Sequence, residues 1–183
     1  MPKWPQIGPV TPQVLSAFYT HPATSLCRLL ANLASTSPSS QGWPTANLAI
    51  FSPLYIPEAC RLTAFWWVNG TSVAGTIDAG VYDGEGHKLA SIGPTTQTPV
   101  SAVQSVALGT PQPIPAGLIY LGFVCSGAAT LWATSGLLGE PTLGAYQQAS
   151  ASPLPTTMTF ATQVANNIRA FKMGALVAPR TVA

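Results

Sequence analysis

The sequence predicts an all-β fold, an antiparallel β-sandwich of jelly-roll or immunoglobulin-like type with about eight to nine strands. Three observations lead to this prediction. From residue 46 onward, short apolar runs alternate with Gly, Pro, Asn and Asp turn residues. Regular helical spacing does not occur between these runs. Hydrophobic residues make up 47% of the chain and charged residues 7%. This composition supplies a core and excludes a disordered chain.

The predicted strands follow one another through residues 45–183, which we take as the sandwich domain. The pair Asn69-Gly70 after the second run is typical of a two-residue hairpin turn. A long Gly, Pro, Ser and Ala loop over 136–158 separates the last two runs from the others. We expect strands at 46–51, 60–68, 76–83, 87–93, 100–108, 118–126, 129–135, 158–164 and 168–177.

Residues 1–44 have a different composition and are predicted to form an extended arm. Their start, "MPKWPQIGPVTPQ", is punctuated by prolines, which favour extended backbone. The leucines from Leu26 to Leu33 come close to helical spacing, so the arm holds one short helix at most. Because the segment has few large apolar residues, we expect it to lie on a partner. The expected arm contacts are Trp4, Ile7, Val10, Phe18 and Tyr19.

Long uncharged stretches indicate a surface that other protein covers. No Asp, Glu, Lys or Arg occurs over residues 89–139 or 141–168. Free monomers usually keep a mixed, charged surface for solubility. We therefore expect assembly, and a hydrated Thr and Ser surface is the alternative. The net charge of +2 and the scattered basic residues give no reason to expect a nucleic-acid partner.

Residues 117–139 are long and uncharged enough for a membrane span. The stretch breaks at Ser126-Gly127 and lacks flanking Lys or Arg anchors. Two strands joined by a Ser-Gly turn fit it better, so no membrane partner is expected. The first ten residues also lack the layout of a signal peptide. The three cysteines have no CxxC spacing, and we expect free thiols rather than a disulfide framework or a zinc site.

The stretch "GTIDAGVYDGEGHKLASIG", residues 75–93, gathers three of the five acidic residues and one histidine. Asp83, Glu85 and His87 form a metal or catalytic site, or else the tip of a hairpin. The alternating oxygen ligands and final Glu of a calcium loop are missing, as is a second histidine for a transition metal. We predict a hairpin tip and no metal.

Asp78 differs from these residues because it lies inside a strand. Alternation places it on the same face as Tyr82 and opposite Ile77. It is either a charge at a sheet edge or a side chain bonded to backbone or to neighbours on the Tyr82 face. The sequence leaves both readings open.

Catalytic motifs do not accompany these residues. Glycosidases hold two carboxyl groups about 5–10 Å apart in a cleft, whereas the acids here lie mostly in turns and at strand ends. A serine triad would depend on His21 or His87, and His87 follows a Gly-rich turn. The GxSxG, HExxH, P-loop and dinucleotide motifs are missing. We expect no enzyme activity and no cofactor.

Trp66 and Trp67 are adjacent in one strand, so their side chains point to opposite faces. One joins the core, and the other contacts protein or stacks on a sugar ring. Together with Tyr82 they are the candidate ligand or subunit-contact residues. Trp43 and Trp132 are assigned to packing.

Several motifs resemble a β-sandwich module of tailed-bacteriophage virion structural proteins. The resemblance covers about residues 43–173 and leaves the arm out. Modules of this kind occur in tail, fibre and head-decoration components, so it implies a structural role without catalysis. The Trp66-Trp67 pair is bulkier than the module leads us to expect. The matching motifs are W-P-T-A-N at 43–47, D-x-G-x-Y-D-x-x-G at 78–86, Val103-Gln104, P-A-G-x-x-Y-L at 115–121 and "SPLPTTMTFA" at 152–161.

The resemblance implies a structural protein of a virion. Combined with the composition, it leads us to expect that the arm and the uncharged faces pack on copies of the chain and on other virion proteins. A closed symmetric oligomer, such as a trimer, is expected for this class. The alternative is a module that binds a glycan on the host surface through Trp66 or Trp67 together with Tyr82.

Overall fold

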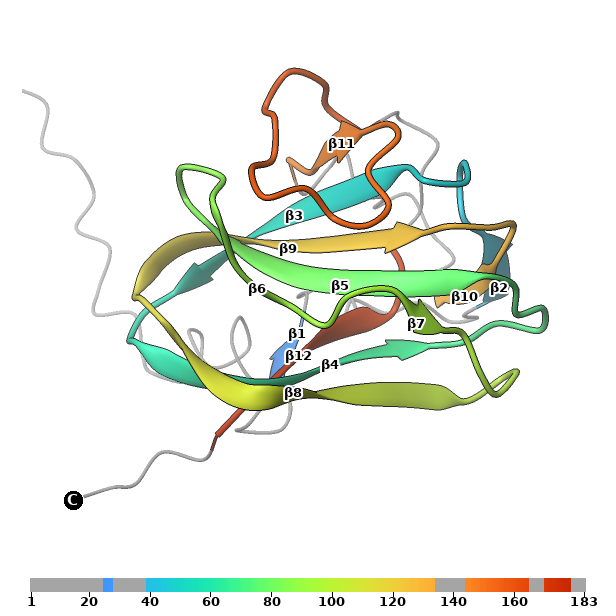
Figure 1. Ribbon diagram of the computed structural model, residues 1–183, viewed down its shortest axis with the longest axis horizontal. Coiled ribbons are helices and arrows are strands. Elements are labelled where there is room, and N and C mark those ends of the chain that lie inside the picture. The colour runs from blue at the N-terminus through green and yellow to red at the C-terminus, as the bar shows by residue number, and fades with distance from the viewer. Residues whose placement is uncertain (1–24, 28–38, 134–143, 165–169, 179–183) are drawn as a thin grey trace, which may run out of the picture.

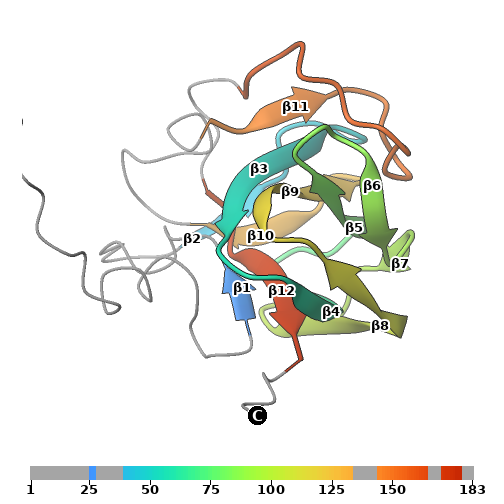
Figure 2. The same cartoon turned by 90° about the vertical axis from the view of Figure 1, so that its left-hand side faces the viewer.

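The computed structural model describes residues 25–27, 39–133, 144–164 and 170–178. For residues 25–27 it describes the backbone alone. Its strands form two main antiparallel sheets that face each other (Figures 1 and 2). The described residues contain no helix, and therefore none that is long and apolar enough to cross a membrane. The predicted antiparallel β-sandwich is confirmed, and several short strands join the predicted ones.

One sheet has four strands in the order β1-β12-β4-β8. Along β4 and β8, Cys60 pairs with Ile114 and Trp67 pairs with Gln104. A bulge interrupts this register near Leu62. The strands of this sheet are β1 (Ser25–Cys27), β4 (Cys60–Val68), β8 (Val103–Ile114) and β12 (Met173–Val177).

The facing sheet is built around a central strand, β9, which pairs with β3 on one side and with β5 on the other. Its order is β11-β3-β9-β5-β6, and β7 also pairs with β5. Its strands are β3 (Ala49–Ile56), β5 (Thr76–Asp83), β6 (Lys88–Ser91), β7 (Thr95–Thr96), β9 (Gly117–Cys125) and β11 (Tyr146–Gln148). A small sheet of β2 (Ser39–Gly42) and β10 (Thr130–Ala133) lies at one end of the sandwich (Figure 1).

The main core lies between the two large sheets. Phe65 of the four-stranded sheet meets Phe123 of the facing sheet edge to face, with ring centroids 6.3 Å apart. Trp43 belongs to the same core, as predicted for a packing residue. Its ring lies 4.9 Å from that of Phe171, and its Nε1 donates a hydrogen bond of 2.8 Å to the Leu48 carbonyl. Each large apolar side chain buried here contributes about 1.5–3 kcal/mol to stability.

A second, smaller core lies on the outer face of the six-stranded sheet. The segment 149–158 covers this face (Figure 1) and packs Leu154 and Met158 in one cluster with Phe51 and Tyr82. The rings of Phe51 and Tyr82 meet edge to face at 5.1 Å. Because the sheet is covered on both faces, β5 is buried along nearly its whole length instead of alternating.

The hairpin predicted at Asn69-Gly70 is wrong. β4 pairs with β8 and β12, and the next strand, β5, belongs to the facing sheet. Neither residue has the positive φ that a type I′ turn requires. The buried Asn69 side chain instead accepts a hydrogen bond from Trp67 Nε1 (2.9 Å) and donates one to the Pro99 carbonyl (2.8 Å). These tertiary bonds outweigh the local turn preference.

Other predicted segments have mixed outcomes. The uncharged stretch 117–139 forms two strands, β9 and β10, in its described part, as predicted. The strand expected at 158–164 is wrong, because this segment makes a single isolated bridge, that of Gln163 with Tyr146. Within the predicted arm, Ser25–Cys27 pairs with β12 as a strand, although the leucine spacing favoured a helix from Leu26. β2 also lies in the predicted arm and pairs with β10.

Candidate functional site

The tip between β5 and β6 holds the acidic residues that the sequence singled out. Asp83 Oδ1 accepts hydrogen bonds from the amides of Glu85 (3.0 Å) and His87 (2.8 Å) and so closes the turn. Gly86 has a φ of 91°, which a glycine adopts without steric cost. The predicted hairpin tip is confirmed.

Asp83, Glu85 and His87 each place one ligand atom within 4.8 Å of the others, close enough to share a metal ion. Partial burial acts to raise the pKa of Asp83. The amide bonds from His87 and Glu85 and the His87 imidazole outweigh this effect and hold that pKa below its ordinary value. The side chains of His87 and Glu85 are 60% and 85% exposed. Because the amide bonds account for the arrangement, we assign these residues to the turn.

Asp78 is buried on the outer face of the six-stranded sheet, where it bonds to backbone. Its Oδ2 accepts a hydrogen bond of 2.9 Å from the Leu154 amide. Lys88 Nζ donates to the Leu154 carbonyl at 2.9 Å, and the Tyr82 hydroxyl donates to the Pro155 carbonyl at 2.7 Å. Three side chains of one hairpin therefore hold the segment over the second core. Of the two readings left open by the sequence, the structure supports bonding to backbone.

Two of the three predicted contact aromatics are buried. Trp67 packs in the main core and Tyr82 in the second core, and both have 0% exposure. An exposed sugar platform made by either of them is therefore wrong, because the segment 149–158 covers the face to which Tyr82 points. Trp66 is half-buried and points away from Trp67, as the alternation predicted.

Trp66 lies on the outer face of the four-stranded sheet. Its register partners are Ser105 on β8 and Gly174 on β12. Its outward neighbours within the paired stretches of β4, β8 and β12 are uncharged, Lys172 borders them beside Val68, and Val103 on the outermost strand is 64% exposed. An uncharged sheet face of this kind suits contact with another protein. The outward positions are Ala64, Trp66, Val68, Val103, Ser105, Ala107, Gly174 and Leu176. We call them the uncharged face.

An aromatic patch lies on the six-stranded sheet beside the hairpin tip. The rings of Tyr120, Tyr146 and Phe160 contact one another at steep angles, with centroids 5.2–6.1 Å apart. The cross-strand pair Tyr55 and Leu118 continues the patch on the same face and is 57% and 44% exposed. The sequence does not predict this patch, because its members come from separate segments that no motif connects.

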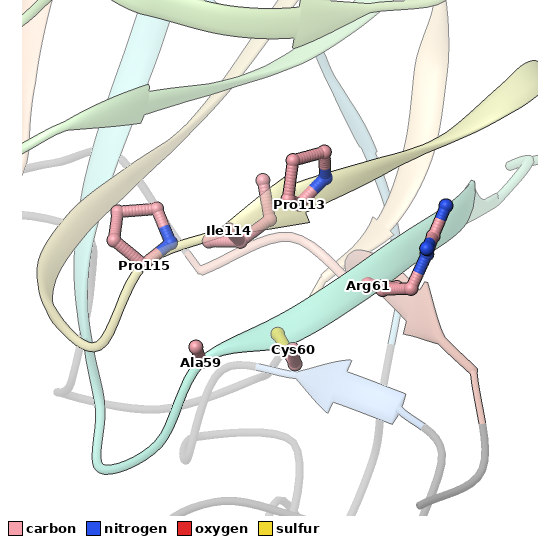
Figure 3. Close-up of a pocket in the computed structure, with 6 residues that line it drawn as sticks. All are labelled: Ala59, Cys60, Arg61, Pro113, Ile114 and Pro115. Atoms are coloured by element: carbon pink, nitrogen blue, oxygen red, sulfur yellow. The ribbon is translucent and has the colours of Figure 1, made fainter.

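A shallow hollow of about 480 Å³ opens where β4 begins and β8 ends (Figure 3). Cys60 and Ile114 are register partners across the two strands, and Ile114 is buried. The walls are apolar except for Arg61, so the hollow suits an apolar side chain better than a charged ligand. Ala59, Cys60, Arg61, Pro113, Ile114 and Pro115 line it.

The predicted arm contacts Trp4, Ile7, Val10, Phe18 and Tyr19 lie outside the described residues. A scan against models of known protein families gives no match, and a search of curated proteins gives none either. What the chain does is therefore inferred from its own residues and surfaces.

Proposed function

We propose that the chain is a structural subunit of a bacteriophage virion that acts by packing on copies of itself and on other virion proteins. The uncharged face carries the assembly part of this proposal, since it joins Trp66 and Leu176 to the exposed Val103 without any charged position. The resemblance of residues 43–173 to β-sandwich modules of tailed-phage virion proteins supports the virion setting.

The outermost strand of this sheet adds to the case for assembly. Sheet edges that stay unpaired in monomers usually carry charged side chains or prolines that block pairing. The outer stretch Val103–Ala107 of β8 has neither, and its outward side chains are exposed. A specific interface buries about 800 Å² on each partner, and each Å² of apolar area contributes about 25 cal/mol. In the proposed assembly, the uncharged face and this edge form one part of such an interface.

Two substitutions test assembly through this face. Val103→Glu and Ala107→Glu place carboxylates on it and spare the core, because both side chains are exposed. The matched control is Thr162→Glu. Thr162 is exposed and lies after the segment 149–158, away from the four-stranded sheet. In sedimentation experiments, wild type and control should form a defined oligomer and the double variant a folded monomer. A wild type that stays monomeric at every concentration would contradict the proposal.

Incorporation into particles tests the virion setting. A chain lacking residues 1–24 keeps β1 and β2, so the sandwich should fold as judged by circular dichroism. If the arm docks on neighbours, this shortened chain should be missing from purified particles that contain the full chain. Normal incorporation of the shortened chain would remove the arm from the proposal.

A second candidate, binding of a host-surface glycan, is favoured by the aromatic patch. Tyr55 and Phe160 are 57% and 40% exposed, and Gly84 of the acidic tip packs beside Leu118. Sugar rings stack on aromatic side chains, and carboxylates accept bonds from their hydroxyls. Glycan-array binding that Tyr55→Ala or Phe160→Ala abolishes, but Trp66→Ala does not, would support it. Binding that survives both patch substitutions, or no binding, would exclude this patch.

A further inference from the structure

We propose that the hollow at the start of β4 and the end of β8 is the receptor for the arm stretch Trp4–Val10 of this chain. The inference rests on the proposed function, in which the arm is an assembly element, and names the place where the arm binds. Three observations support it: the direction of β1, the reach of the arm and the spacing of its apolar residues.

The first observation is the direction in which β1 runs along the sheet. Ser25 pairs with Leu176 of β12, which in turn pairs with Ala64 of β4. Cys27 pairs farther along β12, at Gly174. The chain therefore runs backward from Cys27 to Ser25 in the direction of the first residues of β4. Ser25 is thus the end of β1 that faces the part of the sheet where the hollow lies.

The length of the arm makes the hollow accessible. Ser25 lies two strands and four residue steps from Cys60, which corresponds to roughly 16 Å at the usual strand spacings. Residues 11–24 span up to about 46 Å when fully extended. The stretch Trp4–Val10 can therefore reach the hollow of its own chain or that of an adjacent copy.

The spacing of the arm residues fits an extended ligand. Trp4, Ile7 and Val10 recur at every third residue among prolines. Polyproline II backbone has three residues per turn, so these three side chains lie along one face. One of them fits a hollow of about 480 Å³, and the others lie over its rim, next to Pro113 or Pro115. Because proline fixes the backbone in advance, such a stretch loses little entropy on binding.

The same contact forms within one chain or between copies. The short connection to Ser25 gives the arm a high effective concentration at its own hollow in dilute solution. In an assembly, exchange of identical segments between copies joins them without a new kind of interface. The hollow thus binds the arm of its own chain in the monomer and the arm of another copy in the assembly.

The Cys60 thiol in the hollow allows a direct test (Figure 3). Ile7→Cys in a Cys27→Ser background of the full chain adds a thiol on the apolar face of the arm. Cys125 is buried, and burial raises the pKa of its thiol, so it does not compete. Gln6→Cys in the same background is the matched control, one residue away from that face. After oxidation with diamide, the link from position 7 to Cys60 should form about tenfold faster than the link from position 6, as measured by peptide mass spectrometry.

The outcomes separate the receptor from the proposed function. Equal rates from positions 6 and 7, or no link to Cys60, would overturn the receptor assignment. Ala59→Glu on the exposed rim should slow the link from position 7, and an unchanged rate would also contradict the assignment. A dimer-sized product on a non-reducing gel indicates exchange between copies. A monomer-sized product supports the receptor but removes the arm from assembly, which the Val103→Glu, Ala107→Glu variant tests independently.

Discussion

Asp78 Oδ2 accepts the backbone N–H of Leu154 at 2.9 Å, across 76 residues of sequence. The bond ties the centre of the six-stranded sheet to the segment that covers its outer face. Lys88 and Tyr82 bond to the carbonyls of Leu154 and Pro155 beside it. These three polar side chains thus hold the segment 149–158, with its apolar residues, over the sheet. The second core depends on their hydrogen bonds.

Removal of the Asp78 acceptor should loosen this cover. In Asp78→Ala the Leu154 amide is buried without its partner, which costs about 1–3 kcal/mol. In Asp78→Asn the side-chain oxygen still accepts the bond, so stability at neutral pH should match or exceed that of wild type. Urea unfolding measures the free energies, and hydrogen exchange over 151–158 locates the change. An Asp78→Ala variant as stable as wild type would show that the bond is dispensable.

Asp78 should also make stability depend on pH. Burial raises its pKa above the ordinary value of 3.8, and the Leu154 amide and the Lys88 charge oppose the rise. The folded chain therefore keeps this proton at pH values where the unfolded chain has lost it. The contribution of Asp78 to the free energy of unfolding falls as pH rises from 3.8 through the folded pKa. Urea titrations should show wild type losing stability relative to Asp78→Asn over this interval, and a relative gain would contradict the assignment.

Sequence patterns predicted the parts of the fold that depend on local chemistry. The Gly-rich run after Asp83 became a hairpin tip because its turn bonds join residues that are close in sequence. Asn69-Gly70 has an equally strong local signal, but Asn69 bonds to residues up to 35 positions away. A local pattern does not contain such partners, so that prediction failed.

For the candidate surfaces, too, local features were predicted and features formed by distant residues were not. Alternation correctly placed Trp66 and Trp67 on opposite faces, since this depends only on neighbouring residues. It could not show that a segment more than 60 residues farther along covers Tyr82. The hollow was not predicted either, because it is formed by the ends of two strands that meet only in the folded sheet.

Asn69 should be costly to replace. It accepts from Trp67 Nε1 and donates to the Pro99 carbonyl and to Gln104 Oε1, all within 3.0 Å. Asn69→Ala leaves several buried polar groups unpaired, and we expect a loss of about 1–3 kcal/mol in the free energy of unfolding. Val100→Ala, at a nearby side chain that is 52% exposed, is the control and should change little. Thermal melts that give both variants the wild-type midpoint would rule out a stabilising role.

Gly70 should tolerate no side chain. A Cβ there would overlap Ser40 Oγ and Thr130 Oγ1, which accept hydrogen bonds from the amides of Thr71 and Ser72. Gly70→Ala should therefore push β2 and β10 away from the end of β4 and destabilise the fold by about 1–3 kcal/mol. Gly109 has open space around its Cβ position and no positive φ, so Gly109→Ala is the matched control. If urea unfolding gives the two alanine variants equal stability, the close packing of β2 and β10 against Gly70 is not required.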